Sequence, residues 1–313
     1  MPPRLTNLPF DLDQTLPSVV AVRTTVPADA SSAGRLGTER SGSGVIIAND
    51  GLVATVGYLL TEADSVWIID DSGKAVPGHV VGQDQDSGFG LIQALEPLHR
   101  PPLAFGRSSE LMPGDPLVLA AFGGIDQAVI SRVIAKQEFA GYWEYLLDQG
   151  IFAAPAHPQW TGAAAIDRNG NLVGITSLIF QQFSHGGTNI DANLVIPIDL
   201  LRDILPDMKR IGRSDRPPRP WLGIWTAETE DKLVIAGMSD NGPAKASGLR
   251  VGDAILSVNG VKPRSLADMY RRIWALGPAG ATVPFRVQRK DRELEISVQS
   301  ADRARHLKRP RLN

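Results

Sequence analysis

The chain contains no cysteine, so disulfide bonds, thiolate metal sites and cysteine nucleophiles are all excluded. Histidine is scarce as well. The only histidines among the 313 residues are His79, His99, His157, His185 and His306. Any mechanism that needs a histidine base must therefore use one of these five side chains.

The chain also lacks an excess of charge and a long apolar run. Lysine and arginine number 32 against 34 acidic residues, a net charge of −2, which argues against nucleic acid or an anionic membrane as the partner. No apolar run approaches the length of a membrane span. Residues 1–13 have no signal-peptide pattern, so we expect a cytoplasmic protein, or a periplasmic one if the true start lies upstream.

Short apolar runs separated by Gly, Asp, Asn and Pro extend from Ser18 to Pro197. This pattern is typical of an antiparallel all-β barrel or sandwich. The expected strands are 18–25, 44–48, 52–56, 65–69, 117–122, 128–134, 172–177 and 193–196. Apolar residues at helical spacing then predict one helix over Ile198–Leu205.

A basic, proline-rich stretch divides the chain into two parts, because proline continues neither a helix nor a sheet. Beyond it we expect strands over 221–226, 232–236, 254–258, 282–288 and 294–298 and an amphipathic helix over 265–276. The expected organisation is an N-terminal segment 1–16, a first domain 17–208, a linker 209–219, a second domain 220–302 and a basic, solvated tail 303–313.

Several segments of the first part, in their order and spacing, resemble the HtrA/DegP family of trypsin-like serine proteases. They are 41–47, a strand over Gly51–Leu60, 81–84 leading to 91–92, 103–106, 113–115, 169–175 and 193–197. The resemblance implies an all-β fold, a double antiparallel barrel of the trypsin kind followed by a C-terminal PDZ domain, a β-sandwich with helices. It also implies trimers formed through the protease domains.

The family's catalytic positions can be carried over one at a time. The resemblance places Tyr58 at the histidine base, Gly88 at the orienting aspartate, Thr161 at the serine nucleophile and Gln159 at a glycine of the oxyanion hole. A phenol with a pKa of about 10 is protonated at neutral pH and is no resting base. Without a base and its orienting carboxylate a hydroxyl is a poor nucleophile, so we expect no intact catalytic triad.

Two alternatives would restore a catalytic group to this site. A shifted loop would bring the carboxylate of Asp84 or Asp86 to the position of Gly88. His157, four residues before Thr161, is the histidine nearest to the nucleophile's loop, although a structural role is its more ordinary interpretation. We interpret Tyr58 and Trp160 as bulky side chains that fill the vacated cleft.

The second part resembles a PDZ domain. The resemblance rests on 220–224, similar to the loop that receives a peptide's terminal carboxylate, and on 242–260. By this likeness the backbone of Gly223 binds the carboxylate, and the pocket for the terminal side chain is formed by Leu222, Ile224, Met269 and Ile273. A purely structural core role for these side chains is the competing interpretation.

The leading hypothesis is an HtrA-like pseudoprotease that binds C-terminal or exposed apolar segments of peptides or unfolded proteins through its PDZ domain, as a scaffold, sensor or chaperone. The alternatives are an active serine endopeptidase in protein quality control and a regulatory subunit of an active paralogue. We expect no cofactor and no metal, and a homo-oligomer such as a trimer, with Phe10 as an aromatic anchor for assembly.

Overall fold

The computed structural model describes residues 8–185 and 187–308, and its contacts divide the chain into two compact units. The first unit comprises the chain up to Gln137 together with Gln149–Asp215. The second unit comprises Glu138–Asp148 and residues 216–308. A short segment from the middle of the first domain thus belongs, by its contacts, to the second unit.

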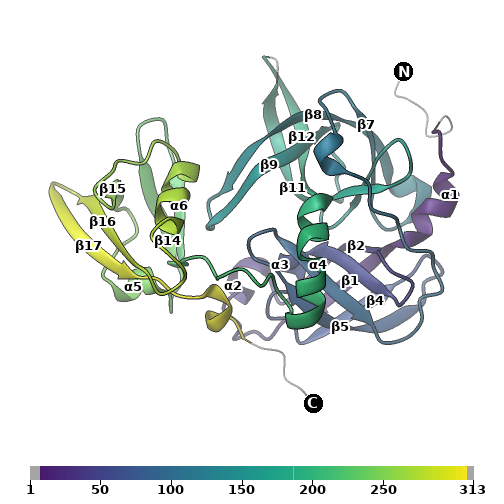
Figure 1. Cartoon of the computed structure of the whole chain (residues 1–313), viewed down its shortest axis with the longest axis horizontal. Coiled ribbons are helices and arrows are strands. Elements are labelled where there is room, and N and C mark those ends of the chain that lie inside the picture. The colour runs from purple at the N-terminus through teal and green to yellow at the C-terminus, as the bar shows by residue number, and fades with distance from the viewer. Residues whose placement is uncertain (1–7, 186, 309–313) are drawn as a thin grey trace. The chain divides into compact units, whose positions relative to one another are not determined.

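The first unit begins with a closed antiparallel barrel in the strand order β1-β2-β3-β6-β5-β4 (Figure 1). Its strands are β1 (Val19–Thr25), β2 (Glu39–Ile46), β3 (Leu52–Val56), β4 (Ser65–Ile69), β5 (Ala75–Gln83) and β6 (Phe89–Ala94). Alternate residues of β1 face the barrel core, as a period of two requires. The β2–β3 turn contains Gly51 with a φ of +81°, a conformation that glycine adopts readily.

A second closed barrel follows, in the order β10-β11-β12-β9-β8-β7. Its strands are β7 (Pro116–Ala120), β8 (Ala128–Gly141), β9 (Tyr145–Ala154), β10 (Ala164–Ile166), β11 (Leu172–His185) and β12 (Thr188–Pro197). Buried aliphatic side chains such as Leu119, Ile151 and Val195 form its core. The two barrels together confirm the expected double antiparallel architecture.

Short helical segments lie before and between these strands. They are α1 (Leu12–Thr15), η2 (Leu16–Ser18), α2 (Ala33–Leu36), α3 (Gly57–Leu60), η3 (Ser108–Glu110) and η4 (Gly124–Gln127). The prediction of one strand over Gly51–Leu60 was wrong at its end, because β3 stops at Val56 and α3 follows. The structure thereby turns residues 57–60 out of the ladder at the position where the resemblance places a catalytic residue.

The helix α4 (Ile198–Ile211) is longer than the Ile198–Leu205 expected, so residues 209–211 are helical and not linker. Pro206 lies inside this helix. The helix continues past the proline because Met208 is fully buried, and it ends at Gly212, whose N–H donates to the Met208 carbonyl at 2.9 Å from a left-handed conformation.

The second unit contains one five-stranded antiparallel sheet in the order β13-β14-β15-β16-β17. Its elements are β13 (Ile224–Glu228), β14 (Leu233–Met238), α5 (Pro243–Ala246), β15 (Ala254–Val258), α6 (Leu266–Trp274), β16 (Thr282–Arg289), β17 (Arg292–Gln299) and η5 (Arg303–His306). The apolar face of α6 is buried with the sheet, as its spacing predicts. The order leaves β13 at an edge of the sheet.

Two further expectations need correction. The strands expected over 128–134 and 172–177 continue to Gly141 and His185 as β8 and β11, because each keeps a paired neighbour well beyond the barrel core. The tail expected to be solvated from residue 303 starts as η5, capped by Asp302, and His306 packs on Trp221 with ring centroids 4.8 Å apart. Residues 309–313 lie outside the described residues.

Candidate functional site: the carried-over catalytic positions and an occupied carboxylate loop

Tyr58 lies in α3, at the position carried over from the catalytic histidine. Its hydroxyl donates to the backbone carbonyl of Ser177 in β11 at 3.0 Å. Burial raises the pKa of the Tyr58 hydroxyl above its ordinary value, and a hydrogen bond with the Thr161 side chain opposes that rise. The side chain at the base position is therefore a neutral phenol at physiological pH.

Thr161 meets Tyr58, so the structure brings two of the three carried-over positions together. The phenol has one proton and donates it to Ser177, so Thr161 is the donor in its hydrogen bond with Tyr58. The resulting chain runs from the threonine hydroxyl through the phenol to a peptide carbonyl. None of these groups is a base that can remove the threonine proton.

Gly88 lies beside the start of α3, because its carbonyl accepts a hydrogen bond from the Gly57 N–H at 2.7 Å. Position 88 is thus near position 58, but it supplies no carboxylate. The buried carboxylate of Asp84 accepts from the N–H groups of Ser87 at 2.8 Å and Ser214 at 3.4 Å. Asp84 therefore holds backbone in place and does not orient a base, and Asp86 has interactions of its own.

His157 is buried, and both of its ring nitrogens are engaged. Its Nε2 lies 3.1 Å from the Gln127 carbonyl, and its Nδ1 accepts from the Gln159 N–H at 2.9 Å. This arrangement requires the neutral ring with the proton on Nε2. Burial lowers the pKa of His157, against the opposing effect of the Gln127 carbonyl. The side chain is thus a structural link in the loop.

The hydrogen bond from the Gln159 N–H to His157 also affects the position carried over from the oxyanion hole. An oxyanion hole needs backbone N–H groups that point into the cleft without another partner. The Gln159 N–H instead donates to His157, so this donor is withdrawn from the cleft. Trp160, the residue after Gln159, is half-buried, and its carbonyl accepts a hydrogen bond from the Thr176 hydroxyl. Whether Tyr58 and Trp160 fill a former cleft stays a prediction.

In the second unit, the loop expected to bind a carboxylate holds one. The N–H groups of Leu222 and Gly223 donate to the two carboxylate oxygens of Glu144 at 2.8 and 2.9 Å. Glu144 belongs to the tip of the β8–β9 hairpin, which the contacts assign to this unit. Glu144 is not predictable from the sequence, because a single glutamate 78 residues before the loop has no local signal.

Burial raises the pKa of the Glu144 carboxyl from 4.5 to about 7. The backbone N–H groups of Leu222, Gly223 and Ile224 and the positive charge of Arg303 oppose this rise. The carboxyl group is therefore held by good donors but at a cost of desolvation.

The four side chains expected to form the terminal-residue pocket, Leu222, Ile224, Met269 and Ile273, are buried in one cluster. Leu146, from the same hairpin as Glu144, lies in this cluster at 8% exposure. One segment thus contributes an apolar side chain to the core cluster that contains these four residues and a carboxyl group to the carboxylate loop. The binding role of the four residues stays a prediction.

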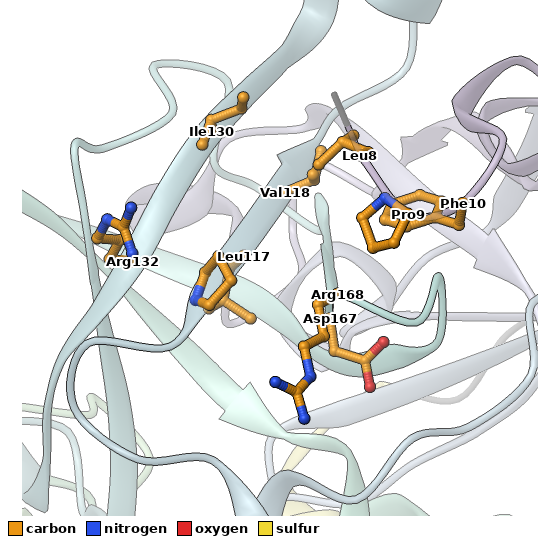
Figure 2. Close-up of a pocket in the computed structure, with 10 residues that line it drawn as sticks. Leu8, Pro9, Phe10, Leu117, Val118, Ile130, Arg132, Asp167 and Arg168 are labelled. Carbon is orange, nitrogen blue, oxygen red and sulfur yellow. The ribbon is translucent and has the colours of Figure 1, made fainter. Parts of the chain in front are cut away.

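Phe10 lies against Gly170 in the first unit and lines a cavity of about 270 Å³. Figure 2 shows Pro9 and Phe10 on one side of this cavity and Arg132 on the opposite side. Its expected role in assembly stays a prediction. Within residues 8–185 and 187–308, no three histidine or acidic side chains gather as metal ligands, and no helix is long and apolar enough to cross a membrane.

Comparison with protein families finds two matches. The model of the trypsin-like peptidase domain matches residues 42–175, and that of the PDZ domain matches residues 220–299. The two matches follow one another in the order that the resemblance predicted.

Curated relatives agree with these matches. A probable periplasmic serine endoprotease, DegP-like, of Pseudomonas fluorescens is 28% identical over 276 residues, 82% of this chain and 56% of that protein. Its counterpart in Bartonella henselae is 26% identical over 82% of this chain and 52% of its own length. The chain therefore spans about half the length of the curated relatives it matches.

Solved structures share the fold. The HtrA-type protease AlgW with a tripeptide has a TM-score of 0.54 at 22% identity and covers 96% of this chain and 97% of its own. A serine endoprotease from Yersinia pestis has a TM-score of 0.51 at 20% identity, covering 95% and 99%. The barrels, the sheet, the two family matches and these relatives agree, and the chain is an HtrA-like protein with a trypsin-like peptidase domain followed by a C-terminal PDZ domain.

Proposed function

We propose that this protein is a pseudoprotease that binds peptide or unfolded-protein segments ending in an apolar residue with a free carboxylate. One observation carries the proposal: the N–H groups of Leu222 and Gly223 already hold a carboxylate, that of Glu144. Paired backbone donors of this kind capture C-terminal carboxylates, while an edge strand such as β13 accepts the peptide backbone.

The catalytic centre supports the first half of the proposal. Tyr58 is a neutral phenol, position 88 lacks a carboxylate, and the threonine hydroxyl donates into a chain that ends at a carbonyl. Loss of one triad member lowers kcat by up to roughly 10⁶-fold in a well-studied serine protease. A site that lacks all three retains a protease framework without its proton transfer.

A second candidate is an active serine endopeptidase, because the curated relatives are named as serine endoproteases. It requires a base other than Tyr58, either His157 after rearrangement or a residue from another subunit. A role as regulatory subunit of an active paralogue, assembly into trimers and work in protein quality control belong to the same set of hypotheses. Since the curated relatives are named as periplasmic, we propose a periplasmic location, the alternative expected if the true start lies upstream.

A fluorophosphonate probe and unfolded casein distinguish the two candidates. The full chain should neither take up the probe nor cleave casein, and Thr161→Ala should behave identically, because no base activates the threonine. A DegP-like relative serves as the positive control. Labelling or casein cleavage that disappears in Thr161→Ala would show an active endopeptidase and overturn the pseudoprotease assignment.

Peptide binding has its own test. Fluorescein-labelled octapeptides ending in leucine are titrated with the full chain, once as the free acid and once as the C-terminal amide. The free acid should bind about 10-fold or more tightly, because a charge-assisted pair of hydrogen bonds contributes more than a neutral one. Equal affinities for acid and amide would contradict a carboxylate-binding role of the loop.

A further inference from the structure

The hairpin tip that carries Glu144 imitates the last residues of a bound peptide. Glu144 fills the carboxylate loop, and two residues earlier the Tyr142 carbonyl accepts from the Thr226 N–H in β13 at 3.0 Å. Because β13 is an edge strand, that N–H is a donor an added strand would use. The segment therefore combines carboxylate capture with backbone pairing at the sheet edge.

Side-chain contacts fasten the same segment to α6. The buried Tyr270 hydroxyl donates to the Gly141 carbonyl at 2.8 Å and accepts from the Glu144 N–H at 3.1 Å. The exposed Arg271 forms ion pairs with Glu138 and Asp148, at the two ends of the segment. These contacts orient the tip so that its acidic side chain enters the loop.

Apolar contacts complete the arrangement. Leu146 is buried in the cluster that holds Ile224 and Met269, and the rings of Trp143 and Tyr145 stack with centroids 5.8 Å apart. The stacked rings stiffen the tip, which lowers the entropy lost when it docks. The segment thus presents an apolar anchor and a carboxylate together, which is the chemistry of an apolar peptide terminus.

We propose that residues 138–148 are an internal ligand of the PDZ domain, which keeps the carboxylate loop closed until the C-terminus of another chain displaces Glu144. This proposal rests on the proposed function, since it concerns regulation of the same loop. It adds that the resting PDZ domain is occupied and that binding is an exchange of one carboxylate for another.

A bound peptide and the docked hairpin exclude each other, because both need the same backbone N–H donors. The two N–H groups of Leu222 and Gly223 are both used by Glu144, and the Thr226 N–H is used by Tyr142. Each N–H has one proton to donate, so the peptide's carboxylate and the Glu144 carboxyl group cannot both be bound at the loop. Peptide and hairpin therefore compete, and the apparent affinity for peptide is lowered by the fraction of protein whose loop is open.

The test compares Glu144→Ala with Asp291→Ala in the full chain at pH 6. Asp291 is an exposed acidic residue in the turn between β16 and β17, so its variant matches the loss of charge without touching the loop. The probe is the fluorescein-labelled octapeptide ending in leucine, as acid and as amide. Glu144→Ala should bind the acid about 10-fold more tightly than the wild type, whereas Asp291→Ala should match the wild type.

Amide hydrogen exchange provides a readout that needs no peptide. Without Glu144 the Leu222 and Gly223 amides should exchange at least about 10-fold faster than in Asp291→Ala. Glu144→Gln, which keeps one acceptor oxygen, should fall between Glu144→Ala and the wild type in both measurements, and it preserves the test if the alanine variant fails to fold.

The outcomes separate the two proposals. Faster exchange with tighter binding of the acid supports both. Unchanged exchange at both amides, or equal peptide affinity in the wild type and in both Glu144 variants, overturns the internal ligand while leaving peptide binding in place. No binding of the acid by any variant, with exchange accelerated, overturns peptide binding and with it the exchange of carboxylates.

Discussion

Alanine at position 162 should strongly destabilise the first unit. Gly162 follows Thr161 and has a φ of +76°, where a side chain adds about 1–2 kcal/mol of strain. A Cβ there would also lie 2.0 Å from the Ser43 carbonyl oxygen, a backbone atom that already accepts from the Thr55 hydroxyl. Overpacking against backbone adds further strain, and we expect a total loss of about 4 kcal/mol or more in the free energy of unfolding.

Gly73→Ala is the matched control for Gly162→Ala. Gly73 has a φ of +84°, yet no atom lies within 4 Å of the Cβ that alanine would add. The control therefore bears only the conformational strain, about 1 kcal/mol. Urea unfolding of the full chain, followed by circular dichroism, measures both variants. Equal midpoints for the two would contradict the close packing of Ser43 against Gly162.

The advantage that Glu144→Ala has over the wild type in peptide affinity should shrink as the pH rises. Docking raises the pKa of Glu144 from 4.5 to about 7, so the docked hairpin favours the protonated carboxyl. Docking is then strongest below pH 4.5, weakens as the pH rises toward 7 and is constant above it. Between pH 5 and pH 8 the docking constant should fall on the order of 50-fold.

The quantity to measure is the ratio of the peptide affinity of Glu144→Ala to that of the wild type. The peptide's own carboxylate titrates in the same loop in both proteins, so its effect cancels from this ratio. The charged and titratable groups that affect Glu144 here are Arg303 and the Tyr270 hydroxyl, and burial raises the pKa of Tyr270 further above neutrality. Neither group changes charge between pH 5 and pH 8. A ratio that stays constant, or that grows with pH, would contradict the raised pKa of Glu144 in the docked hairpin.

Local patterns predicted much of the fold. The strands 52–56, 65–69 and 254–258 agree with β3, β4 and β15 at both ends, because turn residues bound each apolar run. The ends of β8, β11 and α4 were predicted too early. Their outer parts are held by neighbouring strands or by a buried side chain such as Met208, and the apolar pattern of a short window does not contain these contacts.

For the candidate site too, some features were predictable from the sequence and others depend on the folded structure. That positions 58, 88 and 161 lack a base, a carboxylate and a serine follows from residue type alone, once the resemblance has assigned the positions. Two other features depend on the folded loops. The ring nitrogens of His157 are engaged by Gln127 and Gln159. The hydrogen bonds run from Thr161 through Tyr58 to Ser177.

By itself the sequence indicated two β-rich domains and their families, and it predicted that the triad is not intact, because periodicity, turn residues and side-chain chemistry are properties of short stretches of chain. Only the tertiary structure decided that the carboxylate loop is occupied. Glu144 and Leu222 are 78 residues apart, and their contact exists because residues 138–148, the tip of the β8–β9 hairpin, pack within the second unit against α6 and β13. Contacts between such distant residues are selected by the packing of whole elements, which local periodicity does not encode.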